Sequence, residues 1–185
     1  VNYFGTTPAR DSIWAITLLT GRRPGRPVNS TKVVSWAMEM SGIPDWLFQE
    51  CYDGVGDMSE TIALVLEKTR ERKDVSLADT IEGIIIPLKE LPEDEQKKVL
   101  QELWSSMEDR ERFLFNKLIG GSFRVGVSQN LVIRALSKFS GIEEQVISHR
   151  LMGHWTPDEE SYRALISTDA SDADHSRPYP FSLAY

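Results

Sequence analysis

The chain has 185 residues, of which 41% are hydrophobic, and its formal net charge at pH 7 is −7. A chain of this length and composition can bury one sizeable core or two small ones, and no stretch approaches the ~20 consecutive apolar residues of a membrane span. Cys51 is the single cysteine, so an internal disulfide is excluded and a reducing cytoplasm is the expected compartment.

Apolar residues recur at the three- and four-residue spacing of amphipathic helices along most of the chain. Good capping residues, such as Asn29 and Ser76, precede several of these stretches, and Pro92 is followed by three acids, as at the first position of a helix. Helices are expected at residues 13–20, 30–41, 45–52, 58–72, 76–86, from 92 onward, 107–119, 128–139, 143–152 and 157–166. The triplet Ile84-Ile85-Ile86 could form a buried strand, but no second strand candidate pairs with it. The sequence therefore predicts an all-α, multi-helix fold.

Both ends of the chain look like cut edges. Residues 1–4 resemble the last turn of a helix, because they run directly into the breakers Gly5 and Pro8. The tail from Thr168 is polar, acidic and then proline-rich, a composition typical of interdomain linkers. We therefore interpret the chain as a piece of a longer protein, with a helical domain at residues 1–167 and a linker at residues 168–185 toward a missing domain.

Two windows of the sequence contain no acidic residue, although the chain as a whole is acidic. They span residues 12–38, with four bases, and residues 112–142, with five. The bases are Arg22, Arg23, Arg26 and Lys32 in the first window and Arg112, Lys117, Arg124, Arg134 and Lys138 in the second. Segregation of this kind can give an acidic protein a basic face that binds nucleic acid, although chance clustering on solvated helices would look the same.

The two windows also belong to an internal repeat. When the chain is shifted by 99 residues, Leu19-Thr20-Gly21 aligns with Leu118-Ile119-Gly120, and Ser41-Gly42-Ile43 aligns with Ser140-Gly141-Ile142. Repeat units at about residues 13–56 and 112–155 each contain a helix, a basic loop with glycine, a capped helix and a short helix. Such copies can lie about a pseudo-two-fold axis, although helical hairpins also resemble one another generically.

Each copy places its basic loop directly before a helix N-terminus, where exposed backbone N–H groups and nearby arginines favour phosphate. The sequence thus predicts two phosphate clamps, at residues 21–30 and 120–129. The residues expected to contact DNA are Gly21, Arg22, Arg23, Arg26, Asn29, Ser30, Lys32, Lys117, Gly120, Gly121, Ser122, Arg124, Gly126, Ser128 and Gln129. Neither loop has a stripe of Asn, Gln and Arg along a helix face for reading bases, so binding is expected to be independent of DNA sequence.

Three motifs carry a resemblance to a known family. The stretch at residues 111–128, with Ala135-Leu136 ending the helix that follows, resembles the hallmark of the N-terminal domains of ATP-dependent DNA ligases. Residues 53–63 resemble the family's Gly-Asp-x-x-Glu-x-Ala segment. Residues 19–24, together with 176–184, are similar to a bacterial subgroup. One departure is Ser122-Phe123, which stands where a Lys or Gly and a Leu are commoner, so one basic phosphate contact is in doubt.

The resemblance implies a helical DNA-binding module with internal two-fold character, which binds the minor groove on either side of a nick. Its partners would be nicked double-stranded DNA and the nucleotidyltransferase and OB domains of the same parent chain. The resemblance places ATP and Mg²⁺ in those later domains, whose Lys-x-Asp-Gly motif is absent here, so no catalytic residue, metal site or cofactor is expected in these 185 residues. Nick sealing in repair, replication or recombination, at the nucleoid of a bacterial cytoplasm, would be the work of the whole ligase.

Other chemistry has weaker support. The histidines and Cys51 show no metal-ligand spacing, and Asp57 and Glu60 suit the start of a helix better than acid catalysis. Five tryptophans lie within apolar stripes and are expected mostly in the core: Trp14, Trp36, Trp46, Trp104 and Trp155. The alternative to DNA binding is a helical-repeat scaffold that binds protein through its acidic face; a free-standing enzyme is disfavoured.

Overall fold

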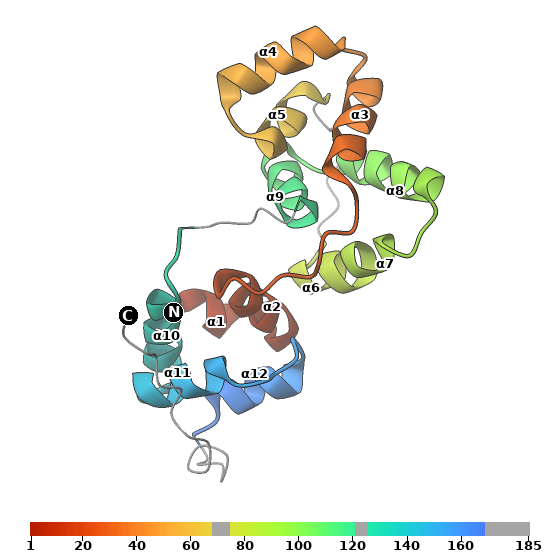
Figure 1. The fold of residues 1–185 in the computed structure, drawn as a ribbon. Helices are drawn as coiled ribbons and strands as arrows, with labels where there is room; N and C mark the ends of the chain where they lie inside the picture. Colours follow the sequence, from red (N-terminus) through yellow and green to blue (C-terminus); the bar gives the residue numbers. More distant parts are fainter. Residues whose placement is uncertain (68–74, 121–125, 169–185) are drawn as a thin grey trace, which may run out of the picture. The chain divides into compact units, whose positions relative to one another are not determined.

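The computed structural model describes residues 1–67, 75–120 and 126–168, and every regular element in these ranges is a helix (Figure 1). The all-α prediction is therefore confirmed. The expected linker lies outside the described residues, apart from Thr168. Within the described part, no helix is long and apolar enough to cross a membrane.

The chain divides into two compact units, one formed by Val1–Arg22 with Arg124–Tyr185 and the other by Arg23–Phe123. We call them unit 1 and unit 2. Unit 1 contains α1 (Asn2–Thr6), α2 (Ala9–Leu19), α10 (Gln129–Ser140), α11 (Glu144–Met152) and α12 (Glu159–Ile166). Unit 2 contains α3 (Ser30–Ser41), α4 (Asp45–Val55), α5 (Met58–Val65), α6 (Leu77–Thr80), the π-helix η1 (Ile81–Ile85), α7 (Ile86–Leu88), α8 (Glu93–Ser106) and α9 (Asp109–Ile119). This division of the residues was not predicted from the sequence.

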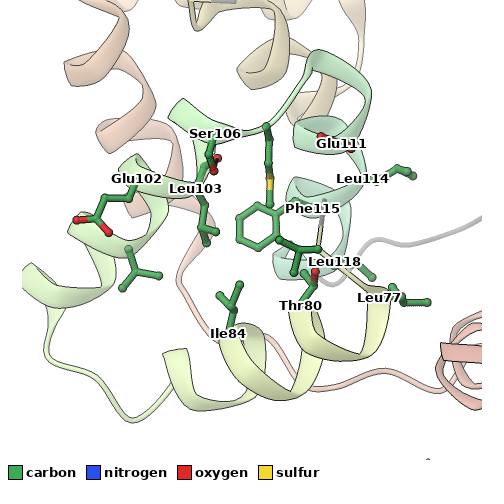
Figure 2. A pocket seen from close by; sticks show the side chains of 13 residues that line it. Leu77, Thr80, Ile84, Glu102, Leu103, Ser106, Glu111, Leu114, Phe115 and Leu118 are labelled. Atoms are coloured by element: carbon green, nitrogen blue, oxygen red, sulfur yellow. Dashed lines mark hydrogen bonds between the residues drawn. The ribbon is translucent and has the colours of Figure 1, made fainter. Parts of the chain in front are cut away.

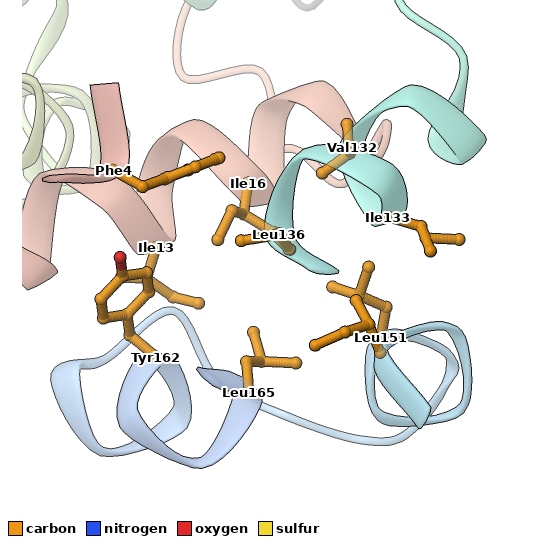
Figure 3. Packing of buried hydrophobic residues seen from close by; sticks show 10 residues of the cluster. Phe4, Ile13, Ile16, Val132, Ile133, Leu136, Leu151, Tyr162 and Leu165 are labelled. Carbon is orange, nitrogen blue, oxygen red and sulfur yellow. The ribbon is translucent and has the colours of Figure 1, made fainter. Parts of the chain in front are cut away.

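Unit 1 has its own hydrophobic core, to which all five of its helices contribute. Figure 3 shows Ile13 and Ile16 of α2 facing Leu136 of α10, with Leu151 of α11 and Leu165 of α12 closing the cluster. All five side chains are buried. Burying aliphatic side chains of this size contributes about 1.5–3 kcal/mol each, so this core can hold the five short helices together.

The core of unit 2 is organised around α9, which packs along α5. Arg112 of α9 is completely buried and donates to the main-chain oxygens of Trp104, Ala63 and Glu67 at 2.6–3.1 Å, as well as to Leu66 and Met107. Burial lowers the pKa of the Arg112 guanidinium group. A planar fork with five donors can satisfy several carbonyls at once, which suits Arg112 to the buried carbonyls at the ends of neighbouring helices.

Arg112 also explains a wrong prediction. The helix expected at residues 58–72 ends at Val65, and Leu66 has an extended backbone with ψ 146°. Apolar periodicity continues past this point, so the sequence pattern alone does not show the end. The carbonyls of Ala63, Leu66 and Glu67 turn to the Arg112 guanidinium group instead of continuing a helix. Residues 68–72 of the expected helix lie outside the described residues.

Helix bounds in the two halves of the chain differ by the 99 residues of the predicted repeat. α3 begins and ends 99 residues before α10, α4 begins 99 residues before α11, and α3 and α10 both end at a left-handed glycine, Gly42 (φ 69°) and Gly141 (φ 78°). The first helix of each predicted repeat lies in the compact unit that contains the remaining helices of the other repeat. α2 packs on α12 in unit 1, and α9 packs on α5 in unit 2, so neither predicted repeat unit, 13–56 or 112–155, lies in one compact unit.

Three smaller expectations have mixed outcomes. Ser76 caps α6 through a bond from the Asp79 amide to its Oγ (3.0 Å), as predicted, while Pro92 occupies the cap position of α8 and not the first helical position.

Trp14, Trp36 and Trp104 are buried. Trp46 is 67% exposed, so its assignment to the core is wrong: it lies in the first turn of α4, which buries only Phe48.

A candidate nucleic-acid interface at two helix N-termini

The first predicted clamp begins where α2 ends. Gly21 has φ +83°, its amide donates to Leu18 O (3.1 Å), and the Arg22 amide donates to Thr17 O (3.0 Å). These two bonds close the helix in a Schellman motif, which requires the left-handed conformation that glycine adopts without strain. Gly21 therefore sets the direction in which the loop leaves α2, and we assign it this structural role.

Arg22 points into unit 1. Its Nη2 donates to Leu151 O (2.9 Å) and Gly153 O (3.0 Å), and its guanidinium carbon lies 4.1 Å from the centre of the Trp155 ring. Trp155 in turn donates from Nε1 to Leu151 O (3.0 Å). The sequence predicts Arg22 as a phosphate ligand, but its donors face the carbonyls at the end of α11. We therefore treat Arg22 as the residue that anchors the loop.

The other bases of the first clamp are nearer to solvent. Arg23 and Arg26 are exposed, and Lys32 forms an ion pair with Glu93 in which both side chains are about half exposed. Exposed pairs of this kind contribute little to stability, so Lys32 can exchange Glu93 for a phosphate at small cost.

The N-terminus of α3 is open. Asn29 Oδ1 accepts a bond from the Thr31 amide (2.9 Å), and Asn29, Ser30 and Thr31 are all exposed. The Asn29 side chain thus satisfies one of the free amides of the first turn. The Lys32 amide donates to Asn29 O (3.1 Å), and the first turn contains no carboxylate.

The second predicted clamp follows α9, and only its edges are described. Gly120, the counterpart of Gly21 in the repeat, has φ −71°, so the two glycine turns differ in backbone conformation. Gly121, Ser122 and Arg124 lie outside the described residues. Gly126 has φ +65° and precedes α10 by three residues.

The N-terminus of α10 matches that of α3. Ser128 Oγ accepts a bond from the Leu131 amide (3.4 Å), and Ser128, Gln129 and Asn130 are exposed. No acidic residue occupies the first turn. Among the described helices of eight or more residues, α3 and α10 alone begin without an acid. In the other helices, first-turn carboxylates complement the positive end of the helix dipole. The N-termini of α3 and α10 lack such a carboxylate, so they can bind an anion from outside the protein.

Lys117 lies in α9 before the second clamp, and it pairs with a carboxylate. Its ammonium group contacts Asp57 Oδ2 and lies 5.5 Å from the centre of the Phe113 ring. Asp57 Oδ1 accepts the Glu60 amide (3.1 Å), which caps α5 as the sequence predicts. Partial burial acts to raise the pKa of Asp57, but the hydrogen bonds from Lys117 and Glu60 outweigh it, so the pKa lies below its ordinary value. The pair was not predicted, although each residue belongs to one of the motifs quoted above.

Along the sequence, each predicted clamp contains a boundary between the two units. The chain passes from one unit to the other between Arg22 and Arg23 and again between Phe123 and Arg124, which places one crossing in each predicted clamp.

Among the residues that the structure describes, no group of three or more His, Cys, Asp or Glu side chains could hold a metal ion.

Comparison with known proteins gives one match. The sequence model of a family described as "DNA ligase N terminus" matches residues 1–137, which include both clamps and the motif of residues 53–63. No individual curated protein matches the chain.

Proposed function

The chain belongs to the DNA ligase N-terminal family, and on that basis we propose that it binds double-stranded DNA through backbone phosphates at the N-termini of α3 and α10. The observation that carries this proposal is the absence of acids from the first turns of these two helices alone among the described helices of eight or more residues. Both ends are exposed and capped by a neutral side chain, so their free amides can donate to phosphate oxygens.

Charge distribution supports the same sites. Each helix N-terminus lies inside one of the two acid-free windows, so no acid close to it in the sequence would repel DNA, and Glu93, which pairs with Lys32, would be displaced by phosphate. Arg23, Arg26 and Lys32 would add charge-assisted contacts around α3. Arg124 and Gln129 would do so around α10. Phosphate contacts position a protein without reading bases, so we propose binding that is independent of DNA sequence.

The proposal extends to the parent enzyme. A module of this family would hold a nicked duplex, in the minor groove on either side of the break, for nucleotidyltransferase and OB domains that use ATP and Mg²⁺. The pseudo-two-fold relation between the two clamps is part of the proposal, because duplex DNA has matching local two-fold axes.

Fluorescence anisotropy with nicked, intact and single-stranded DNA, each at several salt concentrations, tests the proposal. If about 6–10 phosphates are contacted, affinity for duplex DNA falls about 10³–10⁵-fold between about 50 and 200 mM salt. Absence of duplex binding, or binding that salt does not weaken, would contradict the proposal and favour a protein-binding scaffold. Equal affinity for nicked and intact duplexes would contradict only the proposed preference for a nick, and not the binding of duplex DNA.

Arginine variants locate the contacts. Arg26→Ala and Arg124→Ala are each expected to weaken binding to all DNA sequences equally and to lower the salt slope by about 1. Arg163→Ala is the matched control, because Arg163 is an exposed arginine on α12 that pairs with Glu159 (2.9 Å). Loss of binding to one base sequence alone would contradict phosphate recognition.

A further inference from the structure

Unit 2 contains an apolar groove whose lining residues include none from the first turns of α3 and α10. It has a volume of about 380 Å³ and is formed by α6 and η1 on one side and by α8 and α9 on the other (Figure 2). Leu77 and Ile84 face Leu103 and Phe115 across it. The volume falls within the range of about 300–1,000 Å³ that is typical of binding pockets.

Helical periodicity explains why two long helices direct apolar side chains into this groove. Val99, Leu103 and Ser106 lie on one face of α8, and Leu114 and Leu118 lie on one face of α9. Leu114 is nevertheless 48% exposed, on the open side of the groove. Contact with another apolar surface would remove this area from water, which is the main favourable term in association.

The groove has an acidic character that argues against DNA as its occupant. Among the described residues that line it, Glu102 and Glu111 are the only ionisable ones. The sequence of unit 2 as a whole, residues 23–123, holds 19 acids against 13 bases. A polyanion would be repelled here, whereas a cationic ligand would be attracted.

We propose that this groove docks an amphipathic helix of a partner protein, with Leu, Ile, Phe or Met side chains inserted between η1 and α9 and with Lys or Arg residues beside Glu102. The described residues of unit 2 offer no strand edge onto which an extended peptide could add, so a helix laid in the groove is the recognition mode that fits the surface. This surface does not depend on the DNA-binding proposal, because the two involve different residues.

The test uses the 185-residue chain and a synthetic probe. The probe is a fluorescent peptide of Leu and Lys in which the leucines recur at helical spacing, and its partner is a scrambled peptide of the same composition. Anisotropy is measured at about 150 mM salt, where unspecific attraction between exposed charges is screened beyond about 8 Å. Methyl NMR spectra of the protein then report whether Leu77, Leu103 and Leu114 are the residues that the peptide perturbs.

Two variants and two matched controls complete the experiment. Leu114→Lys and Glu102→Lys alter the groove at exposed positions, so we expect the fold to be preserved, and the methyl NMR spectrum of each variant checks this. Leu64→Lys is the control for the first, because Leu64 is an exposed leucine of α5 outside the groove, and Glu50→Lys is the control for the second on α4. We expect each groove variant to weaken peptide binding about tenfold or more, a loss of at least about 1.4 kcal/mol, and each control to leave it unchanged.

Several outcomes would overturn the proposal. Equal binding of the scrambled peptide would reduce the interaction to unspecific charge attraction. An equal loss of peptide affinity in the groove variants and in their controls would show that the peptide binds outside the groove. Self-association of the chain that Leu114→Lys abolishes would make a second copy the occupant, and weaker duplex binding by Leu114→Lys would assign the groove to DNA.

Discussion

The ammonium group of Lys117 lies against the carboxylate of Asp57, so a lysine near the end of α9 is paired with the residue that caps α5. The two residues are 60 positions apart in the sequence. Their pairing ties the start of α5 to α9 immediately before the second clamp. Its loss is therefore expected to affect stability first and DNA binding only through the placement of residues 120–129.

Stability should depend on the charge of Asp57 at low pH. The folded-state pKa lies below the ordinary value of 3.8, so the contribution is present above that value and disappears as the pH falls through the folded pKa. Asp57→Asn keeps a good cap and removes the charge, at a cost of about 0.5–1 kcal/mol at neutral pH. Urea unfolding at neutral pH and near pH 3 checks this, because the difference between wild type and Asp57→Asn should be smaller at the lower pH. Asp57→Ala serves as the comparison that also loses the cap; an unchanged difference at both pH values would contradict the pairing.

An acid placed in the first turn of α10 should separate stability from DNA binding. Gln129→Glu complements the helix dipole and is expected to stabilise the protein by about 0.3–1 kcal/mol, while its charge repels phosphate and weakens DNA binding. Thermal unfolding and anisotropy measure the two effects on one variant. Gln145→Glu in the first turn of α11 is the control, because that helix already begins with Glu144 and is not proposed to contact DNA. Unchanged DNA affinity in Gln129→Glu would exclude the α10 N-terminus from the interface.

Arg22 should act on DNA binding through stability. Arg22→Ala removes two bonds to carbonyls at the end of α11 and the contact with Trp155, at a cost of about 1–3 kcal/mol. Urea unfolding measures that cost, and anisotropy under fully folded conditions should show only a modest decrease in DNA affinity. Arg22→Ala with wild-type stability and a large loss of DNA binding would make Arg22 a direct phosphate ligand.

Arg112 should be among the residues most sensitive to substitution. Arg112→Met fills much of the same space but leaves the carbonyls of Ala63, Leu66 and Trp104 without their buried donor, which we expect to cost about 3 kcal/mol or more. Arg112→Lys should also destabilise the protein, because one ammonium group cannot replace the planar fork. Thermal unfolding would show both as large decreases in Tm, and near-native stability of Arg112→Lys would mean that a single charged donor suffices.

Local chemistry made much of the fold predictable. Periodic apolar residues and the caps Asn29, Ser76 and Ser128 predict the helices to within a few residues, because periodicity and capping involve only neighbours within one turn. The exposed N-termini of α3 and α10 were predicted for the same reason. The prediction fails for the length of α5, whose end depends on Arg112, and for Trp46, whose exposure depends on what packs against α4.

By itself, the amino-acid sequence determined the helices, their caps and the two acid-free windows, all of which are properties of adjacent residues. Only the tertiary structure decided that α2 packs on α12 and α9 on α5, that the Arg22 donors turn to protein carbonyls, and that Lys117 pairs with Asp57. The physical reason is that a guanidinium or ammonium group can satisfy a phosphate, a carbonyl or a carboxylate equally well in chemical terms. Which of these it meets depends on residues 60 or more positions away, which local patterns do not specify.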